Sequence, residues 1–165
     1  SYVQIDAQMY GVDVDAKLAI NKNFTYSGRF SYVNGQDTTN DEPLILMLPP
    51  NFANSLEFSK SSWKNFYFKV ENQIVLHQTR FPIFNPTIQI YENGVEVDKT
   101  LDLSTPPPTY SLWNLQTGFD FDKHFSVGLN MINVFNKNYK DYLNRMRYFS
   151  YEMGRNIIFN VKYKF

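Results

Sequence analysis

The C-terminal stretch 151–165 alternates between apolar and polar side chains, and this alternation is the feature that most restricts the fold. From residue 157 onward every odd position is aliphatic or aromatic, whereas asparagine and lysine occupy most even positions. A period of two predicts a β-strand with one apolar and one polar face. A chain end that frays in water buries little, so an aromatic strand at the terminus is typical of a barrel whose outer band faces lipid.

Six further segments alternate in the same way, so the chain is predicted to contain seven strands. In the first segment the alternation shifts phase at Tyr10-Gly11, which predicts a β-bulge in one long strand. The dipeptide Asn93-Gly94, between two short alternating runs, predicts a small hairpin inside a long connection. The predicted strands span 1–20, 24–34, 52–58, 66–76, 113–121, 125–131 and 157–165.

The connections between these strands alternate between short and long. Short turns lie near residues 22, 62 and 123, whereas the long connections cover 35–50, 79–108 and 136–153. All eight prolines lie in long connections, as expected if every strand is hydrogen-bonded on both edges. Short turns on one rim and long loops on the other describe an outer-membrane barrel. A strand of ~10 residues rising ~3.3 Å each at a tilt of ~45° spans ~24 Å, which matches the apolar band of such barrels.

The composition removes several other kinds of protein. The chain has 165 residues, no cysteine and a formal net charge of +0, which excludes a disulfide framework, a thiolate metal site and a basic surface for nucleic acid. Its longest apolar run, 44–48, is far shorter than the ~20 residues of a membrane-spanning helix. We therefore expect an all-β, antiparallel protein.

A soluble β-sandwich or lipocalin-like barrel also alternates, with its apolar face turned inward. Charged residues of the polar face, such as Asp13, Arg29 and Lys69, would then form a solvated exterior. Periodicity alone leaves both architectures open. The aromatic content of 18%, the different loop lengths at the two rims and the terminal Phe165 favour the membrane barrel.

The segment 132–165 closely resembles the end of TonB-dependent outer-membrane receptors. Those receptors commonly end with an Asn-Leu-Phe-Asp/Asn-Lys-x-Tyr motif, a loop, a Pro/Met-Gly-Arg-Asn start to the last strand and a terminal aromatic residue. The corresponding stretches here are 133–139 (NVFNKNY), 153–156 (MGRN) and Phe165, with Val134 where leucine is commoner. The stretches 106–115 and 10–14 also look like elements of that family's barrel.

The resemblance implies a definite architecture and role. Residues 1–165 would be about seven C-terminal strands of a larger, 22-stranded transmembrane β-barrel, without its plug domain and upstream strands. The whole protein would import a scarce nutrient, such as a siderophore-like metal chelate, across the outer membrane of a Gram-negative bacterium. Its partners would be outer-membrane lipid, the remainder of the receptor, a TonB-type energy-coupling protein that acts through the plug, and the barrel-assembly machinery.

Two other functions stay open at this point. One is a structural or adhesive outer-membrane barrel without active transport, and the other is a soluble β-sandwich binding module. No catalytic constellation is visible, so we expect neither enzymatic activity nor a cofactor. His77 and His124 lack metal-ligand spacing, and Asp13 and Asp15 are interpreted as members of a charge ladder inside the barrel.

The last long loop carries the candidate ligand contacts. It combines aromatic and cationic side chains, which suit an anionic small molecule or metal chelate, although packing and solvation of the loop explain them as well. The candidate residues are Tyr142, Arg145, Arg147 and Tyr148.

The strand ends carry a second set of candidates. The terminal pattern Val161, Tyr163 and Phe165 resembles the signal that the barrel-assembly machinery reads. Outward aromatics are predicted to form two girdles at the membrane interfaces, with Phe24, Phe66, Phe121, Phe125, Tyr163 and Phe165 at the short-turn rim and Tyr32, Phe52 and Trp113 at the other.

Overall fold

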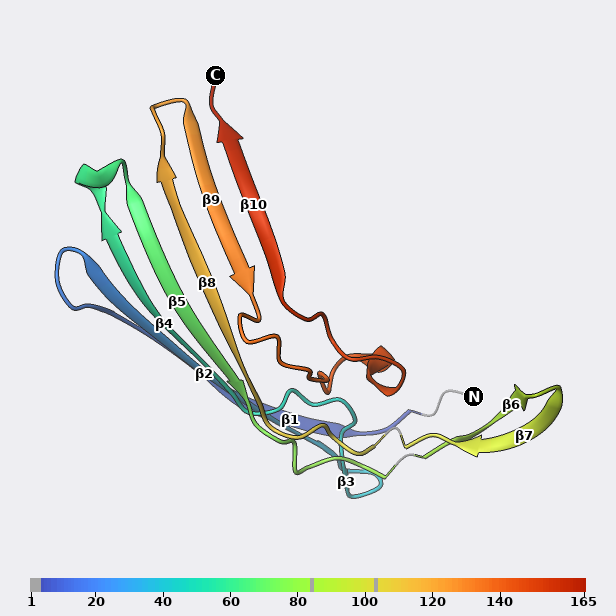
Figure 1. Ribbon diagram of the computed structural model, residues 1–165. Helices are drawn as coiled ribbons and strands as arrows, with labels where there is room; N and C mark the ends of the chain where they lie inside the picture. Colours follow the sequence, from blue (N-terminus) through green and yellow to red (C-terminus); the bar gives the residue numbers. More distant parts are fainter. Residues whose placement is uncertain (1–3, 84, 103) are drawn as a thin grey trace.

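The computed structural model describes residues 4–83, 85–102 and 104–165, and their regular secondary structure is almost entirely antiparallel β-sheet (Figure 1). One sheet has the order β1-β2-β4-β5-β8-β9-β10, with the short β3 paired to β2, and β6 and β7 form a separate hairpin. Two 3-10 turns, η1 (Ser61–Trp63) and η2 (Arg145–Tyr148), lie in connections. The strands are β1 (Ala7–Ala19), β2 (Phe24–Asp37), β3 (Glu42–Pro43), β4 (Asn51–Lys60), β5 (Phe66–Val75), β6 (Thr87–Glu92), β7 (Val95–Thr100), β8 (Tyr110–Asp120), β9 (Phe125–Ile132) and β10 (Asn156–Tyr163).

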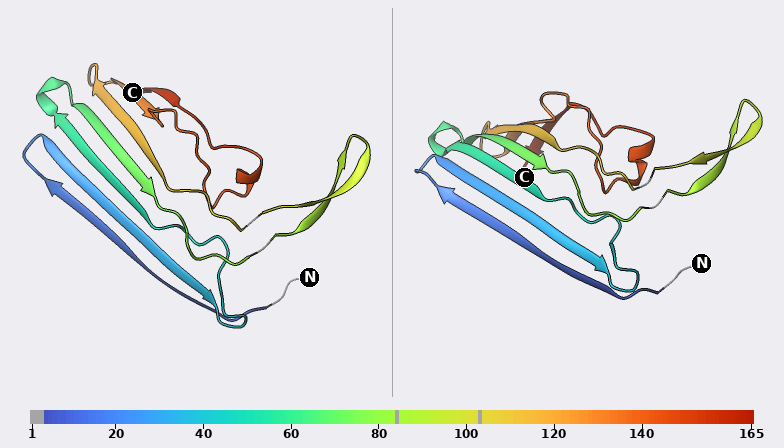
Figure 2. Two further views of the ribbon diagram at one scale, coloured as in Figure 1. Left: turned by 60° about the horizontal axis from the view of Figure 1, so that its bottom comes forward. Right: turned by 90° about the horizontal axis from the view of Figure 1, so that it is seen from below.

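The seven long strands of the sheet are those that the alternation predicts, which confirms the all-β antiparallel fold. The sheet is curved and does not close on itself, because β1 and β10 each have a single neighbour among the described residues (Figures 1 and 2). The short turns lie at one end of the sheet and the long connections at the other (Figure 1). The chain therefore has the form of a segment of barrel wall.

Cross-strand pairing places the apolar and the polar side chains of the strands on opposite faces of the sheet. Val161 pairs with Val127, which in turn pairs with Phe119, so one row across β10, β9 and β8 is wholly apolar. On the opposite face Asp15 pairs with Arg29, and the two side chains form an ion pair with an Nε–Oδ1 distance of 2.7 Å. We call the face that carries this ion pair the inner face and the apolar face the outer face.

The long loops fold over the inner face at their end of the sheet. Val75, Tyr110 and Leu112 are buried there and pack with Tyr139 from the β9–β10 connection. A Cβ at Gly35 would come within 2.6 Å of the sulfur of Met47, so the loop after β3 also lies directly against the strand. The inner face is thus apolar beneath the loops and polar farther along the strands.

The predicted bulge at Tyr10-Gly11 is wrong. β1 and β2 pair residue for residue over their whole length, with no extra residue in either strand. Met9 therefore shares the inner face with Asp13, and it pairs with Gly35 at the level where loop side chains cover that face. The apolar side chains thus change from the inner face at Met9 to the outer face at Val12 without an extra residue, and Met9 itself is 61% exposed.

Other boundaries differ modestly from the prediction. β2 continues to Asp37, β8 begins at Tyr110 rather than at 113, and β3 forms within the predicted loop 35–50. The predicted hairpin is confirmed, since Asn93 and Gly94 form its turn with φ angles of 54° and 81°. It extends away from the sheet (Figure 1). None of the helical turns in the described chain has the length and apolar character that crossing a membrane requires.

Candidate functional site

Tyrosines fasten the β9–β10 connection to the inner face. The rings of Tyr110 and Tyr139 lie 4.6 Å apart between centroids, and the Tyr110 hydroxyl donates to Asp141 Oδ2 at 3.2 Å. Burial raises the pKa of the Tyr139 hydroxyl, and the nearby charges of Glu152 and Asp141 raise it further, so this hydroxyl stays protonated. Ring packing and a charge-assisted hydrogen bond therefore hold the loop on the sheet.

Asn133 organises the start of this connection. It is only 1% exposed and its φ angle is 53°, a left-handed conformation that asparagine tolerates. Its N–H donates to Asn114 Oδ1 at 2.9 Å, its Nδ2 donates to the carbonyl of Lys137 at 2.9 Å, and its Oδ1 accepts from the N–H of Lys137 at 2.8 Å. The same amide reaches the carbonyl of Met153 at 3.4 Å. The two motif stretches that a loop separates in the sequence meet at this side chain.

Arg147 and Tyr142 form the interior of the loop rather than its surface, because they are only 3% and 2% exposed. Arg147 Nη1 donates to the backbone carbonyl of Tyr142. The guanidinium carbon lies 4.7 Å from the centroid of the Tyr142 ring and 4.5 Å from that of Tyr148. Burial raises the pKa of the Tyr142 hydroxyl, while a backbone hydrogen bond with Leu46 opposes the rise, so Tyr142 also joins this loop to the one after β3.

A pocket of about 430 Å³ lies beside this buried cluster. The three long connections meet there, since the wall contains residues from the loop after β3, from the loop after β7 and from the segment around η2. Arg145 is exposed at the pocket, and Phe149 is 71% exposed. Apolar and aromatic walls with guanidinium groups suit an organic anion. The lining residues are Ile45, Leu46, Leu101, Arg145, Arg147, Tyr148 and Phe149.

The structure brings together most of the predicted ligand contacts. Arg145, Arg147 and Tyr148 line one pocket, whereas Tyr142 is buried behind it. Ile45, Leu46 and Leu101 were not predicted as part of a site, because no local sequence pattern connects loops that lie far apart in the chain. The apolar run 44–48 inside a long loop was the available signal. Ligand contact by these residues stays a prediction.

The other singled-out polar residues have structural partners. His77 Nδ1 lies 3.0 Å from the carbonyl oxygen of Pro107, and His124 Nδ1 lies 3.0 Å from that of Lys164, so each imidazole can donate to a backbone carbonyl. Asp15 pairs with Arg29, as described above. In the part of the chain that the structure describes, no cluster of His, Asp and Glu has the arrangement of a metal site.

The aromatic residues predicted at the short-turn rim lie close to one another there. The ring centroids of Phe121 and Phe125 are 6.4 Å apart, and those of Tyr163 and Phe165 are 5.2 Å apart. Tyr163 pairs with Phe125 in the β9–β10 ladder, on the outer face that also carries Val161. Recognition of Val161, Tyr163 and Phe165 by the assembly machinery remains a prediction.

Comparison with protein families decides the identity of this wall segment. The family model described as TonB dependent receptor-like, beta-barrel matches residues 1–134, which is most of the chain. The chain belongs to the TonB-dependent receptor β-barrel family. The match covers the strands up to β9 and ends at Val134, so most of the C-terminal motif lies beyond it.

Solved structures share the fold of this TonB-dependent receptor segment. The copper transporter OprC superposes with a TM-score of 0.79 at 16% identity, over 98% of this chain and 23% of its own. The ferripyoverdine receptor of the outer membrane of Pseudomonas aeruginosa, bound to ferripyoverdine, superposes with a TM-score of 0.64 at 15% identity, over 96% of this chain and 20% of its own. The chain spans less than a quarter of each relative, and at this identity the likeness shows the fold alone. No curated protein sequence matches it.

Proposed function

We propose that this chain is the C-terminal part of a TonB-dependent transporter that imports an anionic metal chelate across the outer membrane of a Gram-negative bacterium. The observation that carries the proposal is the pocket at the long-loop end, where guanidinium groups lie beside apolar and aromatic walls. Guanidinium groups repel a bare metal cation but bind carboxylate, hydroxamate or catecholate oxygens through charge-assisted hydrogen bonds. The names of the structural relatives, a copper transporter and a ferripyoverdine receptor, agree with a metal-containing cargo.

The residues of the pocket divide into two roles in this proposal. The exposed Arg145 binds the negative charge of the chelate, and Tyr148 and Phe149 pack against its organic part. Arg147 and the buried Tyr142 hold the loop in the binding conformation, because the guanidinium is stacked between aromatic rings. The energy for import comes from a TonB-type partner that acts through the plug domain. The assembly machinery recognises the last strand through Val161, Tyr163 and Phe165.

Uptake by cells that express the full-length receptor tests the proposal. Radiolabelled iron is supplied as ferric catecholate or ferric citrate chelates, which carry a net negative charge, to strains with and without a functional TonB protein. We expect Arg145→Ala to raise the half-saturation concentration at least tenfold, because a hydrogen bond to a charged group contributes about 1.5–3 kcal/mol. Lys99→Ala is the matched control, since it removes an exposed cation that pairs with Glu92 at 3.4 Å on the β6–β7 hairpin. Uptake that is independent of TonB, or equal in the Arg145→Ala variant, would contradict the proposal.

A further inference from the structure

The short-turn rim carries an excess of cations on a continuous edge. Backbone hydrogen bonds join its turns side by side, from Ser59 N to Asn23 O at 2.7 Å, from Asp120 N to Lys64 O at 2.7 Å and from Lys164 N to His124 O at 2.8 Å. Lysines occur in every one of these turns or at the adjoining strand ends, namely Lys22, Lys60, Lys64, Lys123 and Lys164.

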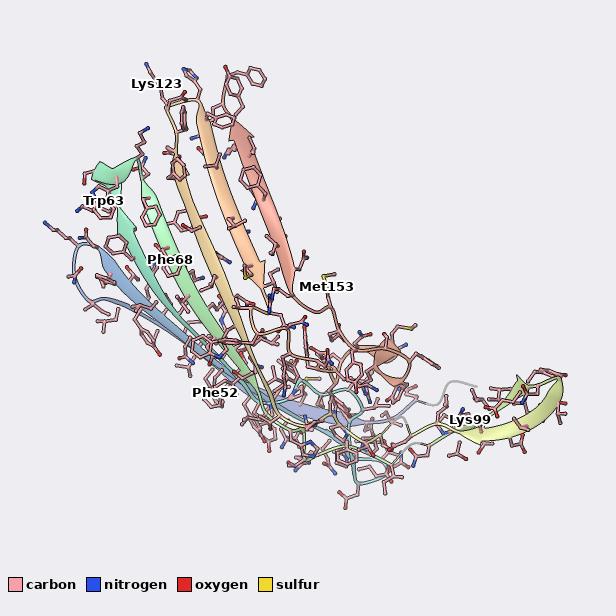
Figure 3. All side chains as sticks on the ribbon, in the orientation of Figure 1. Phe52, Trp63, Phe68, Lys99, Lys123 and Met153 are labelled. Atoms are coloured by element: carbon pink, nitrogen blue, oxygen red, sulfur yellow. The ribbon has the colours of Figure 1, made fainter. Side chains whose placement is uncertain are left out.

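The ammonium groups of two of these lysines lie over aromatic rings of the rim. Lys60 Nζ lies 4.0 Å from the centroid of the Trp63 ring, and Lys64 Nζ lies 4.8 Å from that of Phe121. Trp63 and Phe121 are 55% and 59% exposed, so large aromatic surfaces accompany the ammonium groups. Figure 3 shows Trp63 and Lys123 at this end of the sheet, opposite the long loops. Aromatic rings with adjoining lysines are typical of the level of lipid headgroups.

The acidic residues near this rim either accept hydrogen bonds from neutral groups or lie on the inner face. Asp122 Oδ1 accepts from the N–H groups of His124 and Phe125 at 2.8 and 2.9 Å, which caps the β8–β9 turn. The carboxylate of Asp120 accepts from Asn65 Nδ2 at 2.6 Å and from Ser126 Oγ at 2.7 Å. Glu57 lies opposite Lys69 in the inner-face row, and Lys69 forms its ion pair with Glu71.

No lysine of this rim forms an ion pair with a described residue, and only Lys164 interacts electrostatically with a rim carboxylate, that of Asp120. Ion pairs such as Arg29–Asp15, Lys69–Glu71 and Lys99–Glu92 lie elsewhere in the described chain. Such ammonium groups attract anions at the headgroup level of a membrane, because each lysine near an anionic lipid surface contributes to binding.

We propose that the rim formed by Lys60, Trp63, Lys64, Phe121 and Lys123 binds the headgroup of an anionic phospholipid. The lysine ammonium groups bind the lipid phosphate, and the aromatic rings pack beside the upper part of the acyl chains. This inference rests on the proposed function only in so far as that function places the short-turn rim at a membrane interface. It assigns to this rim a binding role separate from that of the pocket at the long loops.

The test measures lipid binding to the purified, delipidated full-length receptor by native mass spectrometry. The probes are dihexanoyl phosphatidylglycerol and dihexanoyl phosphatidylcholine. We expect the wild type to bind phosphatidylglycerol more tightly than phosphatidylcholine. The double variant Lys60→Ala/Lys64→Ala should bind phosphatidylglycerol roughly 30-fold more weakly, since each lysine contributes about fivefold at an anionic lipid surface. The charge-retaining variant Lys60→Arg/Lys64→Arg should stay close to the wild type.

The opposite end of the sheet offers a matched control. Lys140 Nζ lies 5.2 Å from the centroid of the Tyr151 ring, so Lys137→Ala/Lys140→Ala removes the same charge and a similar cation–aromatic contact. This control should leave phosphatidylglycerol binding unchanged. Equal binding of the two lipids by the wild type, unchanged binding after Lys60→Ala/Lys64→Ala, or an equal loss in the control would overturn the lipid site.

Measuring chelate uptake distinguishes a failure of the lipid site from a failure of the proposed transport function. Lys60→Ala/Lys64→Ala should still import the chelate that the wild type imports, since these lysines belong to the β4–β5 turn, and the short turns lie at the opposite end of the sheet from the long loops (Figure 1). A wild type that transports but binds both lipids alike would refute the lipid site alone. A wild type that neither inserts into membranes nor transports would refute both proposals.

Discussion

The side-chain oxygen of Asn136 lies 2.7 Å from the position that a Cβ on Gly154 would occupy, and it accepts a hydrogen bond from the N–H of Arg155 at 2.8 Å. The contact joins the stretch after β9 to the start of β10 across the whole loop between them. It explains why glycine stands before the last strand, because any side chain there would push Asn136 away from Arg155. The loop geometry at the ligand pocket therefore depends on a contact outside the pocket.

We expect Gly154→Ala to lower the free energy of unfolding of the full-length receptor in lipid vesicles by about 1 kcal/mol, because the new methyl group displaces Asn136 from its hydrogen bond with Arg155. Asn136→Ala should cost about 1 kcal/mol through the lost hydrogen bond. Asn138→Ala, at an exposed neighbouring asparagine, is the control and should stay within about 0.5 kcal/mol of the wild type. Wild-type stability of Gly154→Ala would show that the loop does not need this contact.

The last strand should respond to charge on one face only. Val161 lies in the apolar outer row with Val127, whereas Asn160 lies on the inner face opposite Gly128, beside a hollow of about 290 Å³. Val161→Arg should destabilise the barrel by roughly 2 kcal/mol, because it places a cation against hydrocarbon. Asn160→Arg places its guanidinium in the hollow on the inner face rather than against hydrocarbon, so it should lower the stability of the barrel less than Val161→Arg. The comparison uses urea unfolding in vesicles, and equal effects would remove the assignment of the outer face to lipid.

The two ends of the sheet should lie on opposite sides of the membrane. We expect Glu96→Cys, on the exposed β6–β7 hairpin, to react on intact cells with a membrane-impermeant maleimide. Lys123→Cys, in the β8–β9 turn at the other end, should react only after the cells are permeabilised, since long loops of such barrels face outward. Both variants are compared in a receptor without other reactive cysteines. The reverse pattern would place the ligand pocket on the periplasmic side.

The described wall should not be stable alone in a membrane. β1 and β10 each leave one edge unpaired, and an unpaired backbone group in hydrocarbon costs several kcal/mol. Residues 1–165 refolded in detergent should therefore aggregate or form oligomers, as measured by light scattering after size-exclusion chromatography. The full-length receptor, refolded in parallel, should give one compact, heat-modifiable species. A monodisperse monomer of residues 1–165 would show that seven strands can close without the rest of the barrel.

Much of this fold was predictable from short stretches of the sequence. The alternation through Val161 and Lys162 predicts both the strand and its two faces, because side chains on a strand point alternately toward two different environments. Asn93 and Gly94 likewise predict their hairpin, since few residue types adopt the positive φ angles of that turn. Each of these inferences depends only on neighbours within a few residues.

Only the tertiary structure decided how the loops meet. Leu46, Leu101 and Arg147 come from three different connections and line one pocket. Their meeting depends on the positions of the strand ends in the sheet, which the local alternation of the sequence does not specify. The apparent bulge in β1 fails for a similar reason, because the apolar side chains change face at Tyr10-Gly11 while β1 and β2 stay paired residue for residue, and only the pairing shows this. The sequence by itself thus determined the strands and their faces, whereas contacts between residues distant in the chain determined the pocket.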